Sequence, residues 1–562
     1  MYVDGSSHKV MTHRRPQTAA VTSCLPRSHH VLEDILSKPS VRKALLWITK
    51  RDAEGKCFFM RLCENYDNPQ ADRATRWRWM IPNWAIGLGL RYTGLNKETM
   101  KKQLFHHPPT VKALTLTAKS IGTYGLTVPQ RYTAPLFTVW NVTQACNLDC
   151  MHCYQDATRK PEADELTTEE KLNLIDQMAE EWVPFVAFAG GEPLVLPDLW
   201  KVLEHCQKRG LHVTLATNGT MLTPEMCARL RDAQVKYIEV SIDSIHPEEH
   251  DEFRGQQGAW ARTIQGIKNS VAAGVKTGMA VCFTRRNVDT VDEVVKFAVD
   301  LGCSTLAHFN FIPVGRGKEI VECDLTPAQR ELLMRRLQFH LTESKITVIS
   351  TAPQFGRSCI VYGTQEGLFA TGHAGRGPGQ KTMVLSRYIG GCGTGRCYCA
   401  IQPNGVITPC VYIPRIEVGN IRRNTLREIW DNDLFDVLSD REDLGDHCGV
   451  CHYRSYCGGC RARALSYTGD IQAGDPGCIF NQHEWEEIVR NAEHEASIAA
   501  TGQGIPTDGG NGSQAGHLVQ IMAVSSVAAA AEREKLAGLA EGDVREVKDA
   551  AQRLALLESQ TN

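Results

Sequence analysis

The sequence lacks the features that would direct the chain into a membrane, a secretory route or a nucleic-acid complex. No apolar run approaches the roughly 18–20 residues that span a bilayer. The opening residues, MYVDGSSHKVMTHRRPQ, have no apolar core of the kind found in a signal peptide. The net charge is −2 over 562 residues, so no basic surface for nucleic acid is indicated. We therefore expect a cytoplasmic protein that does not bind nucleic acid.

Cysteine, by contrast, is abundant, with 21 residues in the chain. Disulfides are rare inside cells, so this number favours metal binding over cross-links. The distribution is uneven, because three cysteines fall within residues 146–153 and nine within residues 392–478. Two cysteine-based sites are predicted.

The first set is Cys146, Cys150 and Cys153, in the spacing C-x3-C-x2-C. It follows an apolar run of strand length, residues 136–142, and so lies on the loop that ends a strand. Three thiolates suit three irons of a cubane cluster and leave the fourth iron open. A closed zinc site would need four ligands.

The second set begins at Cys392 and ends at Cys478. A Pro-Asn-Gly turn at 403–405, between apolar runs, predicts a hairpin that brings Cys399 and Cys410 together. Nine cysteines are enough for two four-thiolate iron–sulfur clusters, and equally for two four-cysteine zinc sites. Residue counting alone does not separate the two metals.

Strand-like and helical patterns alternate between the two sets. The helical patterns include residues 168–181, 199–210, 224–234 and 260–274. This order predicts an α/β fold with a parallel sheet and chemistry at the carboxyl ends of its strands. The six predicted strands are residues 136–142, 183–189, 212–216, 237–242, 276–283 and 306–313.

The first cysteine loop resembles the signature of the radical S-adenosylmethionine (SAM) superfamily, with His152 in place of the usual aromatic residue. The resemblance implies a partial (β/α)6 barrel, a SAM-binding [4Fe–4S] cluster on Cys146, Cys150 and Cys153, and SAM itself. Motifs at successive strand ends match the family in order. They imply that SAM is contacted by the GGEP residues Gly190, Gly191, Glu192 and Pro193, by Asn218 of a TNG turn, by Ser241 and Asp243 near the ribose, and by Arg254 at the carboxylate.

The second set is similar to the SPASM domain, which implies one or two auxiliary [4Fe–4S] clusters. Matched residue by residue, Cys392, Cys410 and Cys460 hold the first cluster, and Cys448, Cys451, Cys457 and Cys478 hold the second. The family's cysteine shortly before Cys392 is absent. Its substitute is Cys399 or Cys397, or else the site is open. Cys399 is the better candidate because it lies nearer the turn and Cys410.

The resemblance implies an enzyme that reductively cleaves SAM to a 5′-deoxyadenosyl radical, which then takes hydrogen from a substrate. Residues 448–478 look most like SPASM enzymes that remodel tetrapyrroles, such as haem synthases that remove propionate carboxyls. The alternatives are a peptide or protein maturase and a non-catalytic zinc scaffold. The partners expected are a tetrapyrrole or peptide substrate and an electron donor such as ferredoxin or flavodoxin.

We expect five segments in the chain: a disordered start (1–30), a mainly helical extension (31–134), the barrel (135–347), the SPASM domain (348–495), and a linker with an Ala-rich helical tail (496–562). In the extension, Arg73, Arg76 and Arg78 interleave with Trp77 and Trp79. This pattern favours a docking helix with its tryptophans in the core, and peripheral membrane contact is the alternative.

Overall fold

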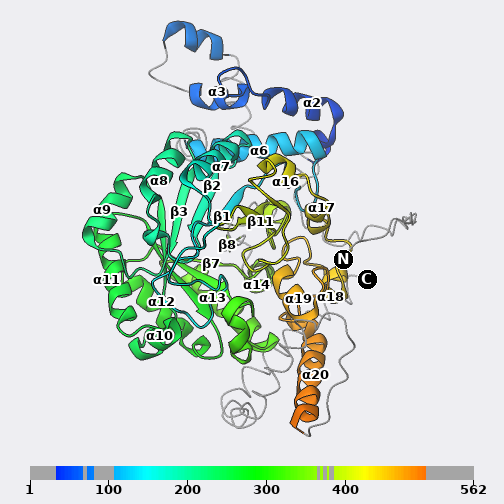
Figure 1. The fold of residues 1–562 in the computed structure, drawn as a ribbon. Helices are drawn as coiled ribbons and strands as arrows, with labels where there is room; N and C mark the ends of the chain where they lie inside the picture. The colour runs from blue at the N-terminus through cyan, green and yellow to red at the C-terminus, as the bar shows by residue number, and fades with distance from the viewer. Residues whose placement is uncertain are drawn as a thin grey trace.

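The computed structural model describes residues 33–66, 72–80, 107–363, 368–370, 376–378 and 385–500 (Figure 1). The expected disordered start and the Ala-rich tail lie outside the described residues. Within the described part, no helix is long and apolar enough to cross a bilayer.

A ten-stranded sheet, in the order β12-β11-β10-β1-β2-β3-β4-β5-β6-β7, forms the centre of the protein. Neighbouring strands from β10 through β1 to β7 are parallel, and β11 and β12 continue the sheet in antiparallel pairs. All six predicted strands are present, and β7 and β10 extend the parallel part beyond them. Their bounds are β1 Phe137–Asn141, β2 Phe185–Ala189, β3 His212–Thr217, β4 Tyr237–Ser241, β5 Thr277–Phe283, β6 Thr305–Asn310, β7 Thr347–Ser350, β10 Tyr398–Ile401, β11 Val406–Thr408 and β12 Gly419–Asn420.

Helices that connect successive strands cover the outer face of the barrel (Figure 1). The Thr167 hydroxyl accepts a hydrogen bond from the Glu170 N–H, and the Glu170 carboxylate accepts one from the Thr167 N–H, which fixes where the first helix of the barrel begins. The helices are α7 Thr168–Glu180, α8 Leu199–Lys208, α9 Pro224–Asp232, α10 Pro247–Arg254, α11 Ala259–Ala272, α12 Val291–Asp300 and α13 Pro327–Glu343, with 3₁₀ turns at Pro193–Val195, Val288–Thr290 and Gly315–Cys323.

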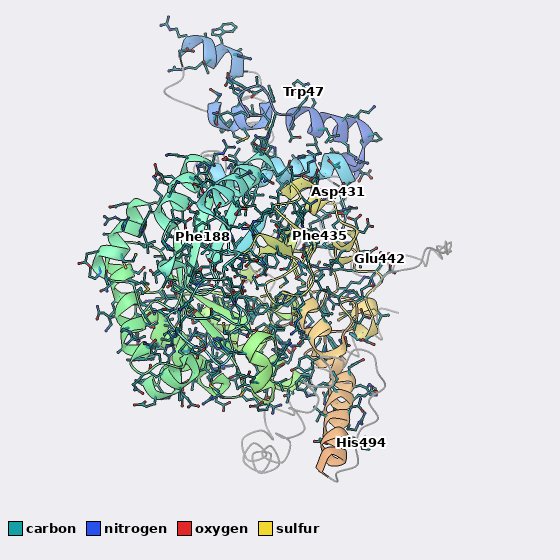
Figure 2. All side chains as sticks on the ribbon, in the orientation of Figure 1. Trp47, Phe188, Asp431, Phe435, Glu442 and His494 are labelled. Atoms are coloured by element: carbon teal, nitrogen blue, oxygen red, sulfur yellow. The ribbon has the colours of Figure 1, made fainter. Side chains whose placement is uncertain are left out.

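Strand residues alternate between the helix layer and the lumen of the barrel. In β2, Val186 and Phe188 are fully buried in the main core, and the Phe188 ring meets Trp140 of β1 edge-on at 5.6 Å (Figure 2 labels Phe188). Ala187 and Ala189, one residue along, face the lumen instead. Small side chains there leave the lumen hollow.

The N-terminal unit contacts the barrel through α6 (Pro108–Tyr124), from which Lys112 donates to the Arg209 carbonyl at 2.7 Å and Lys119 pairs with Glu181 at 3.0 Å. Helices α2 (Pro39–Ile48) and α3 (Phe58–Asn65) pack on α6. Its tryptophans divide between two environments. Trp79 is 6% exposed and packs on Phe58 at 5.3 Å, as a docking helix requires. Trp77 is 75% exposed, and Trp47, which stands far from the sheet in Figure 2, is 65% exposed.

The C-terminal elements lie beside the barrel (yellow-green to orange in Figure 1) and are joined to it by buried charges. Asn310 Oδ1, at the end of β6, accepts hydrogen bonds from Arg330 Nη1 at 2.6 Å and Arg463 Nη2 at 2.7 Å. Arg330 also pairs with buried Asp324 at 2.6 Å. These contacts fix the two cysteine regions relative to each other. The elements are α14 Gln354–Tyr362, β8 Leu368–Ala370, β9 Arg376–Pro378, α16 Leu426–Trp430, α17 Asp433–Ser439, α18 Asp446–Val450, α19 Arg461–Thr468, a 3₁₀ turn Ile479–Asn481 and α20 Gln482–Ala500.

Candidate functional site

The loop after β1 gathers the first three thiols. Cys146 and Cys150 are each 9% exposed, and Cys153 is partly buried beside them. Backbone N–H groups of Leu148 and Ala157 donate to the sulfurs of Cys146 and Cys153, each at 3.4 Å. Such N–H···S contacts are the usual surroundings of cluster thiolates, so the donor set fits an iron–sulfur cluster.

Arg316 and the end of α10 hold this loop in place. The Arg316 guanidinium donates to the carbonyls of Cys150 and Ala157, both at 2.9 Å. The His152 ring stacks on Phe253 with centroids 4.4 Å apart and an angle of 10°. Burial lowers the pKa of His152 to about 4, so its ring is neutral and serves as the aromatic side chain expected at this position.

The two glycines of the GGEP motif are required by close backbone packing. Gly191 N–H donates to the carbonyl of Thr143 at 2.8 Å. A Cβ on Gly191 would lie 2.0 Å from the oxygen of Ala145, in the cysteine loop. Gly190 has φ of +123°, a conformation that other residues rarely adopt. Both glycines line the same cavity as the first cysteine set.

The Glu192 carboxylate is held by donors of the protein itself. It is fully buried, and its carboxylate accepts hydrogen bonds from the Leu194 N–H at 3.1 Å, the Thr217 hydroxyl at 2.7 Å and the Asn218 N–H at 2.8 Å. It is not among the residues that line the cavity, nor is Pro193. In this structure Glu192 therefore supports the turn after β3, and its contact with the amino group of SAM stays a prediction. Asn218, which it supports, does line the cavity.

Asp243 and Arg254 form a buried ion pair at the cavity wall, with Arg254 Nε 2.6 Å from Asp243 Oδ2. Burial, the largest single cause, would raise the pKa of Asp243, but the electrostatic interactions with Arg254, His152 and His250 and the hydrogen bond from Arg254 together outweigh it, and the pKa falls below its usual value. Arg254 Nη1 also points at the sulfur of Cys150, 3.7 Å away. Ser241 lines the cavity on the preceding strand end.

The structure brings together the three predicted cysteines of the first auxiliary set. Cys392, Cys410 and Cys460 all line the cavity that also contains Cys146, Cys150 and Cys153. Cys410 and Cys460 belong to one apolar cluster together with Ala400 of β10. The whole cavity has a volume of about 420 Å³.

The structure does not bring Cys399 to this group. The predicted hairpin is present, but β10 pairs with β11 through Ala400 opposite Thr408. The same register places Cys410 opposite Tyr398, and the Tyr398 hydroxyl lies 3.8 Å from the Cys410 sulfur. Cys399 points to the other face of the sheet, where it is fully buried in the main core, and Cys397 packs against that core as well. Strand parity therefore argues against Cys399 as a ligand, and the fourth ligand of the first auxiliary cluster stays a prediction.

The second auxiliary set surrounds Cys457, whose raised pKa results first from burial and then from the nearby thiols of Cys478, Cys448 and Cys451. The N–H groups of Gly459 and Asp475 donate to Cys457 and Cys448, each at 3.4 Å. These four cysteines thus lie together with N–H···S contacts, which fits a second cluster. Across the described residues, no three His, Cys, Asp or Glu side chains close around a point where one metal ion would sit.

Several residues of the site were missed by the sequence reasoning. Tyr154 and Tyr412 meet edge-on at 5.2 Å between the two cysteine sets and line the cavity. Glu239 also faces the cavity, from the middle of β4. A charged residue at a lumen-facing position of a strand was the signal that could have identified Glu239.

Comparison with known proteins gives a matching description of both cysteine regions. A family model described as the radical SAM superfamily matches residues 140–298, and one described as an iron–sulfur cluster-binding domain, SPASM, matches residues 392–460. An AdoMet-dependent heme synthase of Methanosarcina barkeri is 37% identical over 349 residues, which are 62% of this chain and 97% of that protein.

The names of other relatives indicate other substrates. The mycofactocin maturase MftC of Mycobacterium tuberculosis is 29% identical, over 62% of this chain and 84% of its own length. Among solved structures, Streptococcus suis SuiB bound to S-adenosylmethionine has a TM-score of 0.54 at 16% identity, covering 75% of this chain and 92% of that one. That likeness extends to the fold alone.

Proposed function

The chain belongs to the radical SAM superfamily and carries a SPASM domain, and from this premise we propose that it removes carboxyl groups from propionate side chains of an iron-containing tetrapyrrole. The chain is a radical SAM enzyme with iron–sulfur clusters, so the non-catalytic zinc scaffold is wrong. We also propose the roles of the individual site residues and the boundaries of the domains.

One observation carries the proposal: the first cysteine set and the first auxiliary set line a single, mainly apolar cavity. When bound, the reduced cluster and SAM supply a radical that takes hydrogen from an unactivated C–H bond. A side chain that loses CO₂ and a hydrogen atom also gives up one electron. An acceptor in the same cavity can take it without diffusing, and Cys392, Cys410 and Cys460 are the residues proposed to hold that acceptor.

The chain's own residues organise this cavity. Arg316 and Phe253 fix the cysteine loop, Gly190 and Gly191 let backbone approach a ligand, and the Asp243–Arg254 pair presents a guanidinium at the wall. Phe137, Phe309 and Ile349 give the lumen apolar walls that exclude water and suit a flat hydrocarbon body.

The test is anaerobic incubation of the iron-reconstituted enzyme with SAM, a reductant and iron coproporphyrin. We expect deoxyadenosine to form above the substrate-free background, together with products that have lost one or two propionate carboxyls by mass. Background deoxyadenosine and an unchanged porphyrin would contradict the proposal. Peptide modification is the second candidate, favoured by the similarity to the maturase MftC, and would be tested in the same assay with a precursor peptide.

Two partners complete the proposal. The reducing electron comes from a small carrier such as ferredoxin or flavodoxin in the cytoplasm. The N-terminal unit makes a peripheral membrane contact through Trp47 and Trp77, because large apolar side chains this exposed are typical of binding surfaces. Flotation with liposomes should carry the enzyme upward, and Trp47→Ala with Trp77→Ala should abolish this. Equal flotation of the double variant would show that Trp47 and Trp77 do not make the membrane contact.

A further inference from the structure

The lumen of the barrel contains a carboxyl group that the site described so far does not use. Strand β4 alternates, with Ile238 and Val240 fully buried toward the helices and Tyr237, Glu239 and Ser241 lining the cavity. Among the cavity-lining strand residues of the described chain, Glu239 is the only Asp, Glu, Lys, Arg or His. It is partly exposed to the cavity, so a ligand can reach it.

Glu239 has an unusual set of partners for a carboxylate. The Tyr237 hydroxyl donates to its Oε2 at 3.3 Å. The structure shows no salt bridge to Glu239 from any residue in its described part. Burial raises the pKa of Glu239 to about 7, and the hydrogen bond from Tyr237 opposes that rise only in part. Near neutral pH, a large fraction of this side chain is therefore a neutral carboxyl with an O–H to donate.

The surroundings of Glu239 offer no compensating charge. Its partner in β3 is Ala216 and its partner in β5 is Gly278. The nearby ionisable groups lie on the Tyr237 side: the Lys276 ammonium, 6.0 Å from the Tyr237 ring centroid, and the Cys303 thiol, which adds to the rise in the Tyr237 pKa. At the end of β4, Asp243 is already paired with Arg254.

Gly278 shows that the sheet is shaped around this pair. A Cβ on Gly278 would lie 1.9 Å from the Tyr237 hydroxyl oxygen. Only glycine at this place in β5 leaves room for the phenol beside Glu239. The Glu239 carboxyl thus lies in an apolar lumen without a cation, and the neighbouring strand leaves space for its hydrogen-bond donor, Tyr237. Such a group is positioned for a ligand.

We propose that Glu239, as a neutral carboxyl, donates a hydrogen bond to a carboxylate of the substrate inside the lumen, with Tyr237 holding its other oxygen. This inference rests on the proposed function, since it takes the substrate to be an apolar macrocycle that carries carboxylates. An ionised Glu239 would repel such a group, whereas the neutral form makes a charge-assisted hydrogen bond, which is stronger than a neutral one. Glu239 is thus a positioning residue that selects for carboxylate-bearing substrates.

The proposal has a thermodynamic consequence. The carboxylates of the substrate stay ionised above about pH 6. Binding then requires the protonated form of Glu239, so substrate affinity is constant below its pKa and falls about tenfold per pH unit above it. A substrate cation, such as a peptide lysine, would give the reverse trend, because it would need Glu239 ionised.

The experiment measures the dissociation constant of iron coproporphyrin from the anaerobic holoenzyme by the change in its absorption, between about pH 6 and 9. In the wild type, affinity should fall above about pH 7. Glu239→Gln keeps a donor and loses the titration, so its affinity should be independent of pH. Glu239→Leu should bind more weakly at low pH. Glu204 pairs with Lys208 at the surface, and the control variant Glu204→Gln should show the wild-type affinity profile.

Tyr237→Phe provides a second, independent reading. The hydrogen bond from Tyr237 lowers the pKa of Glu239, so its removal should move the break in the affinity profile to higher pH. Iron content equal to the wild type shows that each variant is folded. An unchanged pH profile in Glu239→Gln, or affinity that rises with pH, would overturn the inference while leaving the proposed function intact. No binding by the wild type at any pH would instead overturn the proposed function and, with it, this inference.

Discussion

Arg254 and Asp243 form one unit, in which Nε and Oδ2 lie 2.6 Å apart and both side chains are almost completely buried at the cavity wall. The sequence match assigned Arg254 to a carboxylate of SAM and Asp243 to the ribose. The structure shows that each is first the other's counter-ion, and that Arg254 Nη1 also approaches the Cys150 sulfur at 3.7 Å. One guanidinium therefore links the cysteine loop, strand β4 and the cavity.

Arg254→Ala should weaken SAM binding and destabilise the fold together. The lost charge-assisted contact to SAM is worth about 1.5–3 kcal/mol, or roughly tenfold or more in affinity. The buried Asp243 left without a partner costs a further 3–5 kcal/mol or so in the free energy of unfolding. Equilibrium dialysis with SAM and thermal unfolding measure the two effects.

The double variant Asp243→Leu with Arg254→Met separates the two effects. It removes the unpaired charge, so stability should return toward the wild-type value while SAM affinity stays low. Wild-type SAM affinity in the double variant would show that neither residue meets SAM.

Gly191→Ala should disrupt the first cysteine set. The new methyl group would lie 2.0 Å from the backbone oxygen of Ala145, and backbone cannot give way as a flexible side chain can. We expect loss of about four irons out of roughly twelve, the content of three [4Fe–4S] clusters. Gly274→Ala is the control: it adds backbone strain, because Gly274 has φ of +76°, but its added methyl meets no atom within 4 Å. Full iron loading in Gly191→Ala would contradict the packing argument.

The barrel was predictable because each strand is a short apolar run followed by a polar motif, and parallel strands present those motifs at one edge. Gly190, Asn218, Ser241 and Asp243 reach one cavity for this reason. The hairpin of β10 and β11 was predicted, but the pairing of β10 with β1 was not, because it joins residues more than 250 positions apart. Local patterns carry no information on such a contact.

The two site residues that the structure moves away from the cavity, Glu192 and Cys399, illustrate a second limit. Both were assigned by proximity along the chain or by motif. Glu192 instead satisfies three donors of its own scaffold, which no spacing reveals. For Cys399 the pattern did contain the answer, since the hairpin register pairs residues whose numbers sum to a constant and so puts Tyr398, not Cys399, opposite Cys410.

Glu192→Gln tests the structural role of that side chain. One carboxylate oxygen accepts from the Asn218 N–H, and an amide group there would bring two donors together. We expect a loss of about 1–3 kcal/mol in the free energy of unfolding, measured in urea, with SAM affinity reduced only through the displaced Asn218. Glu225→Gln, at an exposed helix start, should be nearly neutral. Unchanged stability with lost SAM affinity would restore direct contact between Glu192 and SAM.

The cysteines around the hairpin give the sharpest test of the auxiliary site. Cys460 and Cys410 face the cavity, while Cys399 and Cys397 point to the opposite face of β10. Cys460→Ala should therefore lose about four irons, and Cys399→Ala and Cys397→Ala should keep the wild-type content. Cys399→Ala removes only a small apolar contact in the core, so its effect is expected on stability, at about 1 kcal/mol or less. Iron loss in Cys399→Ala with an unaffected Cys460→Ala would mean that β10 turns its other face to the cluster and that its register with β11 differs from the pairing of Ala400 with Thr408.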